Sequence, residues 1–505
     1  MQMKTRMFFM KNRIVSFSLF TYIFCTHAAD SLISSSSSAN QPDPVMAQPA
    51  FIDRPESARQ YRYMLFPNAR KHPGIDNFWF DLWVMPGGYG SFNNSEFGRY
   101  FSFADSRDGE FTVGSITTPN SDFAAAQLGL SPTFPSRPFR FKPIVHKFVL
   151  NTGLTIGLDP ILDGLYLAGY VPIEWVRYRL KFKTLDEQGG EVIQAFKGGA
   201  HSIDGAPGQT IPPWEHGRIG SKKNADPCSE WGVSDAIADL GWHIVNNEHE
   251  QFGVRLRIIF PSGDTPSTLF WFPPRIGMNR WGVGVGFDGN VVVWEKDAIN
   301  EIAIYLDTYY SFLFPRIERR SFDLCNHGRG SRYMLLKEFN DDGTFNSFVN
   351  GINALTLQAD SGFHWQVEGT VLINMTFDEW SIDFGYNIYG RGQESLCLVG
   401  SIPENRFGIA GSNRATDATT QSTAVLAFQG ADDPAPVFIT THDLNIHNAA
   451  TPRTVQHTFF LYANRVWEDH DFPPYVGFGA EVSFSSDHTG LDQGGIFVRG
   501  GVFYS

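Results

Sequence analysis

A strict alternation of apolar and polar residues is the feature that most limits what this chain can fold into. In residues 363–376 the apolar set is Phe363, Trp365, Val367, Gly369, Val371, Ile373 and Met375, and the polar set is His364, Gln366, Glu368, Thr370, Asn374 and Thr376. Leu372 is the exception to the alternation. Because successive side chains of a strand point to opposite faces, this segment predicts a strand with one apolar and one polar surface.

The next segment repeats the pattern and indicates a hairpin. Apolar and polar residues alternate again from Trp380 to Tyr389, and only residues 377–379 separate the two segments. Both exceed the ~5–6 residues that are common for strands of soluble sheets. They reach the ~9–11 residues that a tilted strand needs to cross a bilayer.

The same alternation recurs along the chain, in residues 176–183, 235–244, 252–260, 302–312, 476–484 and 496–504. One such segment alone would fit the edge of a β-sandwich, but their number and length favour one closed barrel. Charged residues make up 18% of the chain, against roughly 25% in an average soluble domain. We therefore predict an all-β fold, an antiparallel transmembrane β-barrel of about 12–14 strands over residues 77–505.

The lengths of the connections provide a second test. The long connections are 186–232, 261–299, 325–362 and 391–453, and the short ones are 246–250, a tight turn near Pro315, 377–379 and 468–474. Bacterial outer-membrane barrels have short periplasmic turns and longer extracellular loops. The alternation predicts that the final strand runs inward and that the chain ends in the periplasm.

The N-terminus has the layout of a secretory signal peptide. Basic residues precede a short apolar run from Ile14 to Cys25, and small residues at Ala28-Ala29 offer a cleavage site. We expect residues 1–29 to be removed and residues 30–76 to form a flexible periplasmic leader or a partial plug. No later run of about 20 apolar residues supports a spanning helix.

Charge and cysteine usage exclude several functions. Removal of residues 1–29 takes away four basic side chains and no acidic one, which leaves 36 basic against 53 acidic residues. Nucleic-acid binding needs a basic surface and is not expected. The remaining cysteines, Cys228, Cys325 and Cys397, have no CxxC spacing, so no metal site and no cofactor are predicted.

The polar faces of the strands predict the lining of a lumen. A basic row, Arg177, Arg179, Lys181 and Lys183, is expected to face inward, because a midplane Arg or Lys on the lipid face costs about 2–4 kcal/mol. The other candidate lining residues are Asp235, Asp239, Arg255, Arg257, Glu368, Asp383, Glu481 and Arg499. These charges would either line a wet pore and set its ion preference, or pair with each other inside a closed lumen.

Signals for an enzyme are weak, and none is predicted. Residues 284–289 match GxGxxG, but strand-like residues follow them where a dinucleotide site needs a helix, and Asp288-Gly289 is typical of a hairpin turn. Neither HExxH nor GxSxG occurs. Inward histidines such as His243, His364 or His457 near Asp383 fit a pore lining better than a catalytic site.

One hairpin carries a resemblance to a known group. Gly232 to Asp235 precede a strand, a short acidic turn and the strand Phe252–Phe260, which ends in Pro261-Ser262-Gly263-Asp264. This element resembles the bracketed hairpin of barrels related to the long-chain fatty-acid transporter and the phenol-degradation (MetA-pathway) channels, with Ser262 where Thr is usual. The resemblance covers about a tenth of the chain and implies a barrel that admits small, including hydrophobic, molecules. The chain departs from many such barrels by ending on Ser505 after Phe503-Tyr504.

We therefore predict a porin-like channel for passive passage of small molecules, exported to the bacterial outer membrane. Its expected partners are outer-membrane lipid, the barrel-assembly machinery and small-molecule solutes. Two alternatives remain: an adhesin or structural barrel with a closed lumen, whose loop 391–453 binds a partner, and a secreted carbohydrate-binding β-sandwich. The sandwich would stay in solution without detergent, and the closed barrel would insert without conducting.

Overall fold

The structure, a computed structural model, describes residues 51–64, 78–104, 108–115, 121–128, 130, 134–186, 188–198, 212–219, 228–265, 267–296, 300–325, 327–343, 345–409, 437–486 and 489–504. The predicted signal peptide and part of loop 391–453 lie outside these residues.

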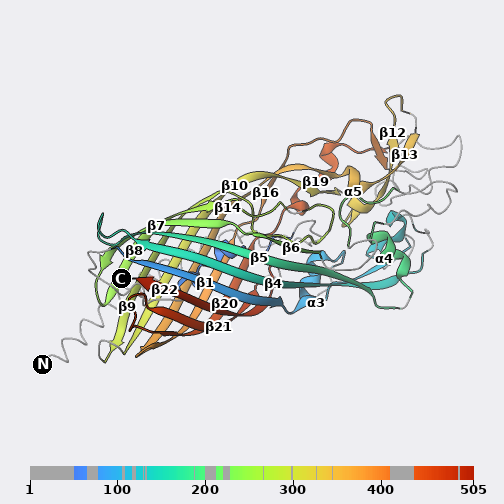
Figure 1. The fold of residues 1–505 in the computed structure, drawn as a ribbon. Helices are drawn as coiled ribbons and strands as arrows, with labels where there is room; N and C mark the ends of the chain where they lie inside the picture. The colour runs from blue at the N-terminus through green and yellow to red at the C-terminus, as the bar shows by residue number, and fades with distance from the viewer. Residues whose placement is uncertain are drawn as a thin grey trace, which may run out of the picture.

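Twelve antiparallel strands form a closed barrel (Figure 1). They are β1 (Phe80–Ser91), β4 (Arg137–Gly157), β5 (Leu165–Thr184), β7 (Ala236–Asn246), β8 (Glu250–Phe260), β9 (Gly282–Glu295), β10 (Glu301–Ser321), β14 (Thr356–Phe377), β15 (Trp380–Arg391), β20 (Thr454–Val466), β21 (Pro474–Ser485) and β22 (Gln493–Tyr504). The barrel closes where β22 pairs with β1, with Val502 opposite Leu82. The predicted fold class is confirmed, at the lower end of the expected strand number.

The two faces of the wall differ in chemistry as the alternation predicts. On β14, Val371 and Ile373 are exposed outside, whereas Glu368, Thr370 and Asn374 are buried inside. The outer face carries an apolar belt, formed by exposed Leu82, Val84, Leu154, Leu167, Val171, Leu240, Leu256, Ile258, Val283, Val285, Val371, Ile373, Ile382, Phe384, Leu461, Val476, Phe478, Ile496 and Val498. Such a belt is stable against lipid and costly against water, so the barrel spans a membrane. None of the described helices is long and apolar enough to cross one.

Glycines on the inner face make room for aromatic rings from the neighbouring strand. A Cβ on Gly153 of β4 would lie 2.2 Å from Cζ2 of Trp83 on β1. A Cβ on Gly385 of β15 would lie 2.1 Å from Cζ of Phe460 on β20. Glycine is therefore required at these positions by close approach, which explains part of the high glycine content of the strands.

The connections sort by length between the two ends of the barrel. At the end of the barrel where Figure 1 marks the C-terminus, the connections are short: 158–164, 247–249, 296–300, 378–379 and 467–473. At the other end they are mostly long: 92–136, 185–235, 261–281, 322–355 and 392–453, with 486–492 the short exception. We call these the short-turn end and the long-loop end.

Additional elements fold over the long-loop end. Three strands extend the barrel sheet beyond its rim, β2 (Glu110–Gly114), β3 (Phe123–Ala124) and β6 (Cys228–Val233), and β16 (Ser395–Leu398) pairs with β14. A separate sheet contains β12 (Leu335–Phe339), β13 (Phe345–Asn350), β17 (Phe407–Ile409) and β18 (Val437–Phe438), and β11 (Asp323–Leu324) pairs with β19 (Leu444–Asn445). The short helices there are α3 (Asn94–Phe97), η3 (Gly98–Phe101), η4 (Ala125–Leu128), α4 (Gly190–Phe196), η5 (Ser331–Tyr333), α5 (Gly351–Ala354), η6 (Thr441–Asp443) and η7 (His447–Ala449).

Three details of the predicted strand layout are wrong. The expected turn near Pro315 does not exist, because β10 continues through it with shifts of register between Ser311 and Arg316. Such an irregularity accommodates a residue that has no N–H to donate. Asp288-Gly289 lies within β9 instead of in a hairpin turn, and β9 itself occupies residues 282–295 of the long connection expected at 261–299.

Candidate functional site: the barrel lumen

Residues 51–64 lie inside the barrel and are buried along their whole length. We call them the lumen segment. It contains two short helices, η1 (Glu56–Ala58) and α2 (Tyr61–Met64). The segment falls within residues 30–76, for which the sequence predicts either a flexible leader or a partial plug.

Arg54 ties the first half of the lumen segment to the wall. Its Nη2 donates to Oε1 of Glu368 on β14 at 2.9 Å and to Oδ1 of Asn387 on β15 at 2.7 Å. The backbone N–H of Gln60 donates to the same Glu368 oxygen at 2.7 Å. Glu368 therefore accepts from two points of the segment, and all of these groups are buried.

A second carboxylate holds the other half of the segment. Glu481 of β21 accepts from Nη2 of Arg62 at 2.7 Å and from the hydroxyl of Tyr61 at 2.8 Å. Arg59 lies 3.8 Å from the same carboxylate and 3.1 Å from Glu56 within the segment. Arg62 also pairs with Glu56. A buried charge is tolerated only when it is paired in this way.

Basic side chains of the wall also contact the segment. Nη2 of Arg257 donates to Oε1 of Gln60 at 2.6 Å, and Nη2 of Arg391 donates to the carbonyl of Ile52 at 3.1 Å. Lys147 of β4 forms an ion pair with Asp53. Contacts on β4, β8, β14, β15 and β21 thus surround the segment from several sides of the barrel.

Aromatic rings fill the space between the ionic contacts. The ring of Tyr61 stacks on Phe460 with centroids 4.9 Å apart, and that of Tyr63 stacks on Tyr170 at 4.3 Å. At the other end of the segment, the ring of Phe51 packs edge-on against Phe97 of α3 at 4.8 Å. The segment therefore reaches from the elements of the long-loop end down into the barrel.

A layer of ionic contacts lies beyond Phe51. Glu318 of β10 accepts from Arg320 at 2.7 Å and from Arg280 at 3.0 Å, and Arg320 also donates to Glu394 at 2.8 Å. Burial by itself would raise the pKa of Glu394, but Arg320 and hydrogen bonds from Ser361 and from the Thr451 backbone hold that pKa below its ordinary value.

Cavities of different size lie around this layer, and the larger ones, of about 410 and 310 Å³, are lined by residues that include Glu318 and Arg320 in the first and Glu394 in the second. A cavity of about 40 Å³ is lined by residues that include Phe51, Trp271 and Arg320. It has room for a few water molecules, because one water needs roughly 10–15 Å³ on this measure. A solute does not fit there.

Most of the predicted lining residues lie inside the barrel. Arg257 pairs with Asp239 at 2.6 Å, and Arg255 pairs with Asp307 at 2.5 Å. Asp383 accepts from Asn374 at 2.6 Å. Glu368 and Glu481 hold the lumen segment as described above, and Arg499 donates to the carbonyls of Arg62 and Tyr63, both at 3.3 Å.

Asp235 has a different place from the one predicted. It follows β6 and precedes β7, and it accepts backbone N–H groups of Gly263 at 3.3 Å, Met278 at 2.5 Å and Asn279 at 2.9 Å. Its carboxylate is therefore used to hold the 261–281 connection. It does not lie beside Arg255 and Arg257 in the lumen, because it precedes β7 and is not part of that strand.

The prediction that Arg177, Arg179, Lys181 and Lys183 face the lumen is wrong. On β5 the inward, buried residues of this stretch are Val176, Tyr178 and Leu180, and the four basic residues alternate with them on the outer face. The predicted penalty for lipid exposure does not apply, because β5 is 20 residues long, about twice what a bilayer crossing needs. The basic half of the strand lies beyond the apolar belt.

The most important residues that the sequence analysis missed are those of the lumen segment. Residues 51–64 carry five charged side chains, Asp53, Arg54, Glu56, Arg59 and Arg62. Charges of both signs in a stretch otherwise rich in aromatic residues were the available signal. The sequence analysis also did not predict Lys147, which pairs with Asp53, or Asp288 and Asp307, which both pair with Arg255.

Comparisons with known proteins give distant structural similarities only. Neither a protein-family model nor a curated protein matches the sequence. The chain is similar to an outer membrane channel from Pseudomonas putida F1, at 10% identity over 87% of this chain and 99% of that chain, with a TM-score of 0.37. It is also similar to a Pseudomonas aeruginosa FadL homologue, at 8% identity over 87% of this chain and 93% of that chain, with a TM-score of 0.27.

A third similar structure is the translocator domain of the autotransporter NalP from Neisseria meningitidis, at 7% identity over 89% of this chain and 95% of that chain, with a TM-score of 0.30. The resemblance indicated by residues 232–264 is matched here, as a weak and partial one. All three TM-scores are below 0.5, so the assignment depends on the strand pairing and the apolar belt of this chain itself. On that evidence the protein is a twelve-stranded outer-membrane-type β-barrel with its own N-terminal segment in the lumen.

Proposed function

We propose that this protein is an outer-membrane channel for passive passage of small molecules, closed at rest by the lumen segment. The observation that carries the proposal is the polar contact between segment and wall, in which Arg54 meets Glu368 and Arg62 meets Glu481. Passage requires the segment to shift, because its residues fill the lumen at the level of these pairs.

The chemistry of the contact supports a segment that moves. Exposure of apolar groups to water costs free energy, whereas ionised groups that leave a buried pair regain hydration, which offsets the loss of the partner. When the segment shifts, water would hydrate Glu368 and Glu481 in place of the groups that the segment withdraws. The lumen wall is polar and the outer wall apolar, which is the division expected of a water-filled passage through lipid.

The expected ion preference is small. The basic row on β5, which the sequence placed in the lumen, lies outside and contributes nothing to selectivity. The inner wall carries both signs, such as Arg255 beside Asp307 and Arg257 beside Asp239. We therefore expect uncharged or zwitterionic solutes to pass as well as small ions.

Location and export follow from the same proposal. The apolar belt places the barrel in a membrane, and short turns at one end with long loops at the other fit the bacterial outer membrane. We propose that residues 1–29 are removed on export and that the barrel-assembly machinery inserts the chain. N-terminal sequencing of protein from outer membranes would then begin at Asp30.

A structural or adhesive barrel is the second candidate, and the closed lumen favours it as well. The sheet of β12, β13, β17 and β18 provides a folded surface at the long-loop end that such a protein would use. In that case the lumen segment would be a permanent filling and would never leave.

Single-channel recording of the refolded full chain and of a variant lacking residues 51–64 separates the two candidates. Heat-modifiable gel migration shows that both are folded. We expect brief openings of the full chain and a stable open level in the deletion variant. A full chain that never opens and passes no small sugars in liposome swelling, beside an open deletion variant, would favour the structural barrel.

A further inference from the structure

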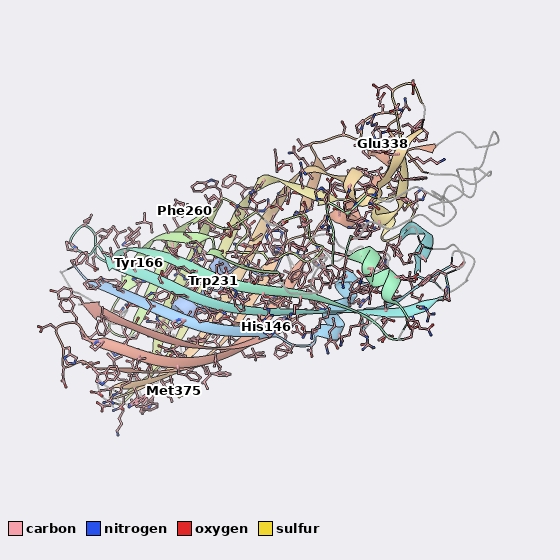
Figure 2. The ribbon with its side chains drawn as sticks, turned by 45° about the vertical axis from the view of Figure 1, so that its right-hand side comes forward. His146, Tyr166, Trp231, Phe260, Glu338 and Met375 are labelled. Atoms are coloured by element: carbon pink, nitrogen blue, oxygen red, sulfur yellow. The ribbon has the colours of Figure 1, made fainter. Side chains whose placement is uncertain are left out.

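The outer face of β4 and β5 carries a concentrated basic surface. Across the two strands Arg177 lies opposite His146, Arg179 opposite Ile144, and Lys181 opposite Lys142. We call this surface the basic patch, and it consists of Lys142, His146, Arg177, Arg179, Lys181 and Lys183. Figure 2 labels His146 on this part of the wall.

The patch contains few compensating carboxylates. Within the described part of the chain, no ion pair is formed by Lys142, Arg177, Arg179, Lys181 or Lys183. The nearest pairs are at its far edge, where Arg140 meets Glu110 and Arg137 meets Asp186 at 2.8 Å. Like charges that face each other across strands are destabilising. The patch is therefore a surface whose repulsion an anionic ligand would relieve.

An exposed aromatic cluster separates the patch from the apolar belt. Phe148, Trp175 and Trp231 lie opposite one another on β4, β5 and β6. The Trp231 ring lies 6.3 Å from that of Phe148 and 6.4 Å from that of Trp175. Trp231 is 63% exposed, and Figure 2 shows it on the outer wall.

The order of these residues matches the depth profile of a lipid leaflet. Along β5 the outer face changes from Leu167 and Val171 in the belt to Trp175 and then to Arg177. Arg177 follows Trp175 by about 7 Å along the strand. Aromatic residues are enriched at the membrane–water interface, and basic clusters beside it bind anionic headgroups.

We propose that the basic patch and the aromatic cluster together bind the phosphorylated glycolipid of the outer leaflet. Its sugar phosphates would lie against Arg177, Arg179 and Lys181, and its acyl chains against Phe148 and Trp231. Arginine pairs with phosphate through two parallel hydrogen bonds, which gives the site its geometric preference. Continuity with the apolar belt favours a lipid over a dissolved anion, which would have no use for the aromatic cluster.

The test measures how a bis-phosphorylated lipid A binds to the refolded full chain in detergent, by native mass spectrometry. We expect the triple variant R177Q/R179Q/K181Q to bind it at least 10-fold more weakly than the unaltered chain. The matched control is R465Q, which removes a partly exposed arginine paired with Glu379 at the short-turn end. Heat-modifiable migration shows that each variant is folded, and a single R179Q variant replaces the triple one if that fails.

Three results would overturn the proposal. One is equal binding by the triple variant and the unaltered chain. Another is equal binding of dephosphorylated and bis-phosphorylated lipid A. The third is full competition by inorganic phosphate together with unchanged binding by W231A, which would mean a site for free phosphate only. None of these results bears on conductance through the lumen, so the failure of this proposal is distinct from failure of the channel.

Discussion

Arg54 and Glu368, 314 residues apart in the sequence, form an ion pair at 2.9 Å that is buried inside the barrel. The pair joins the lumen segment to β14. Arg62 and Glu481 repeat the arrangement at 2.7 Å on β21. Two wall carboxylates on different strands thus hold one segment across the lumen, and the closed state depends on both.

Loss of these carboxylates should open the channel. In the double variant E368Q/E481Q the neutral amides accept weaker hydrogen bonds from Arg54 and Arg62. The free energy that favours the closed over the open state should fall by roughly 1.5–3 kcal/mol. This change raises the open population by about 10- to 100-fold. Open probability in planar bilayers measures this change. D307N is the control, because Asp307 pairs with Arg255, which belongs to the wall and not to the lumen segment. Equal open probability of both variants would mean that Glu368 and Glu481 do not hold the channel closed.

Glycine at position 153 should be needed for stability. In G153A the new Cβ would lie 2.2 Å from the Trp83 ring, which also lies 5.5 Å from the ring of Tyr63 and 4.5 Å beneath Arg499. Trp83 has to move, and overpacking of this kind costs about 1–3 kcal/mol. Urea unfolding in micelles should show the loss. G88A is its counterpart on β1, where an added Cβ meets nothing within 4 Å, and equal midpoints for the two variants would show that the inner wall is not tightly packed.

Asp235 should keep the connection between β8 and β9 in a fixed conformation. D235A leaves the backbone N–H groups of Gly263, Met278 and Asn279 without their acceptor, at a cost of about 1–3 kcal/mol for each group that stays buried. Protease cleavage within residues 261–281 on intact cells should rise about 10-fold. D235N keeps one acceptor oxygen and should lie between. If D235A resists protease as the unaltered chain does, the carboxylate does not hold this loop.

The alternation of side chains predicted the wall well, because it is a direct consequence of strand geometry. Leu372, the one apolar residue in the polar series of β14, is fully buried inside and packs in a cluster with Tyr61 and Phe460. The prediction fails where the register changes. Beyond the irregularity near Pro315, Phe363 is buried inside although it shares the series of the outward Val371.

The basic row shows why the alternation of side chains alone does not determine which face of a strand faces the lumen. If the basic row faced the lumen, Val176, Tyr178 and Leu180 would face outward, but these three residues form part of an interior cluster. A strand that extends far past the membrane has no lipid on its outer face there, and the core under the long loops can be apolar. Strand length relative to the bilayer was the missing information.

The contacts of the lumen segment with the wall could not be predicted from the sequence, for another reason. Two of its main partners, Glu368 and Glu481, are more than 300 residues away, and no local period links them to the segment. Only the closure of the barrel brings β14 and β21 to the same interior space.

Cross-linking the lumen segment to the wall and then releasing it tests whether movement of this segment opens the channel. In a background with Cys228, Cys325 and Cys397 replaced by serine, Tyr63→Cys on the segment and Tyr170→Cys on β5 replace two rings that stack at 4.3 Å. A short bis-methanethiosulfonate reagent joins the two thiols, and a reductant separates them again. Single-channel current is recorded before cross-linking, after it and after reduction.

If the lumen segment has to shift for solutes to pass, the double variant should open before cross-linking, stay closed after it and recover its openings on reduction. The single variants Tyr63→Cys and Tyr170→Cys, treated alike, should conduct throughout. Equal current in the cross-linked and reduced states of the double variant would show that solutes pass without movement of residues 51–64, and that the segment does not close the channel.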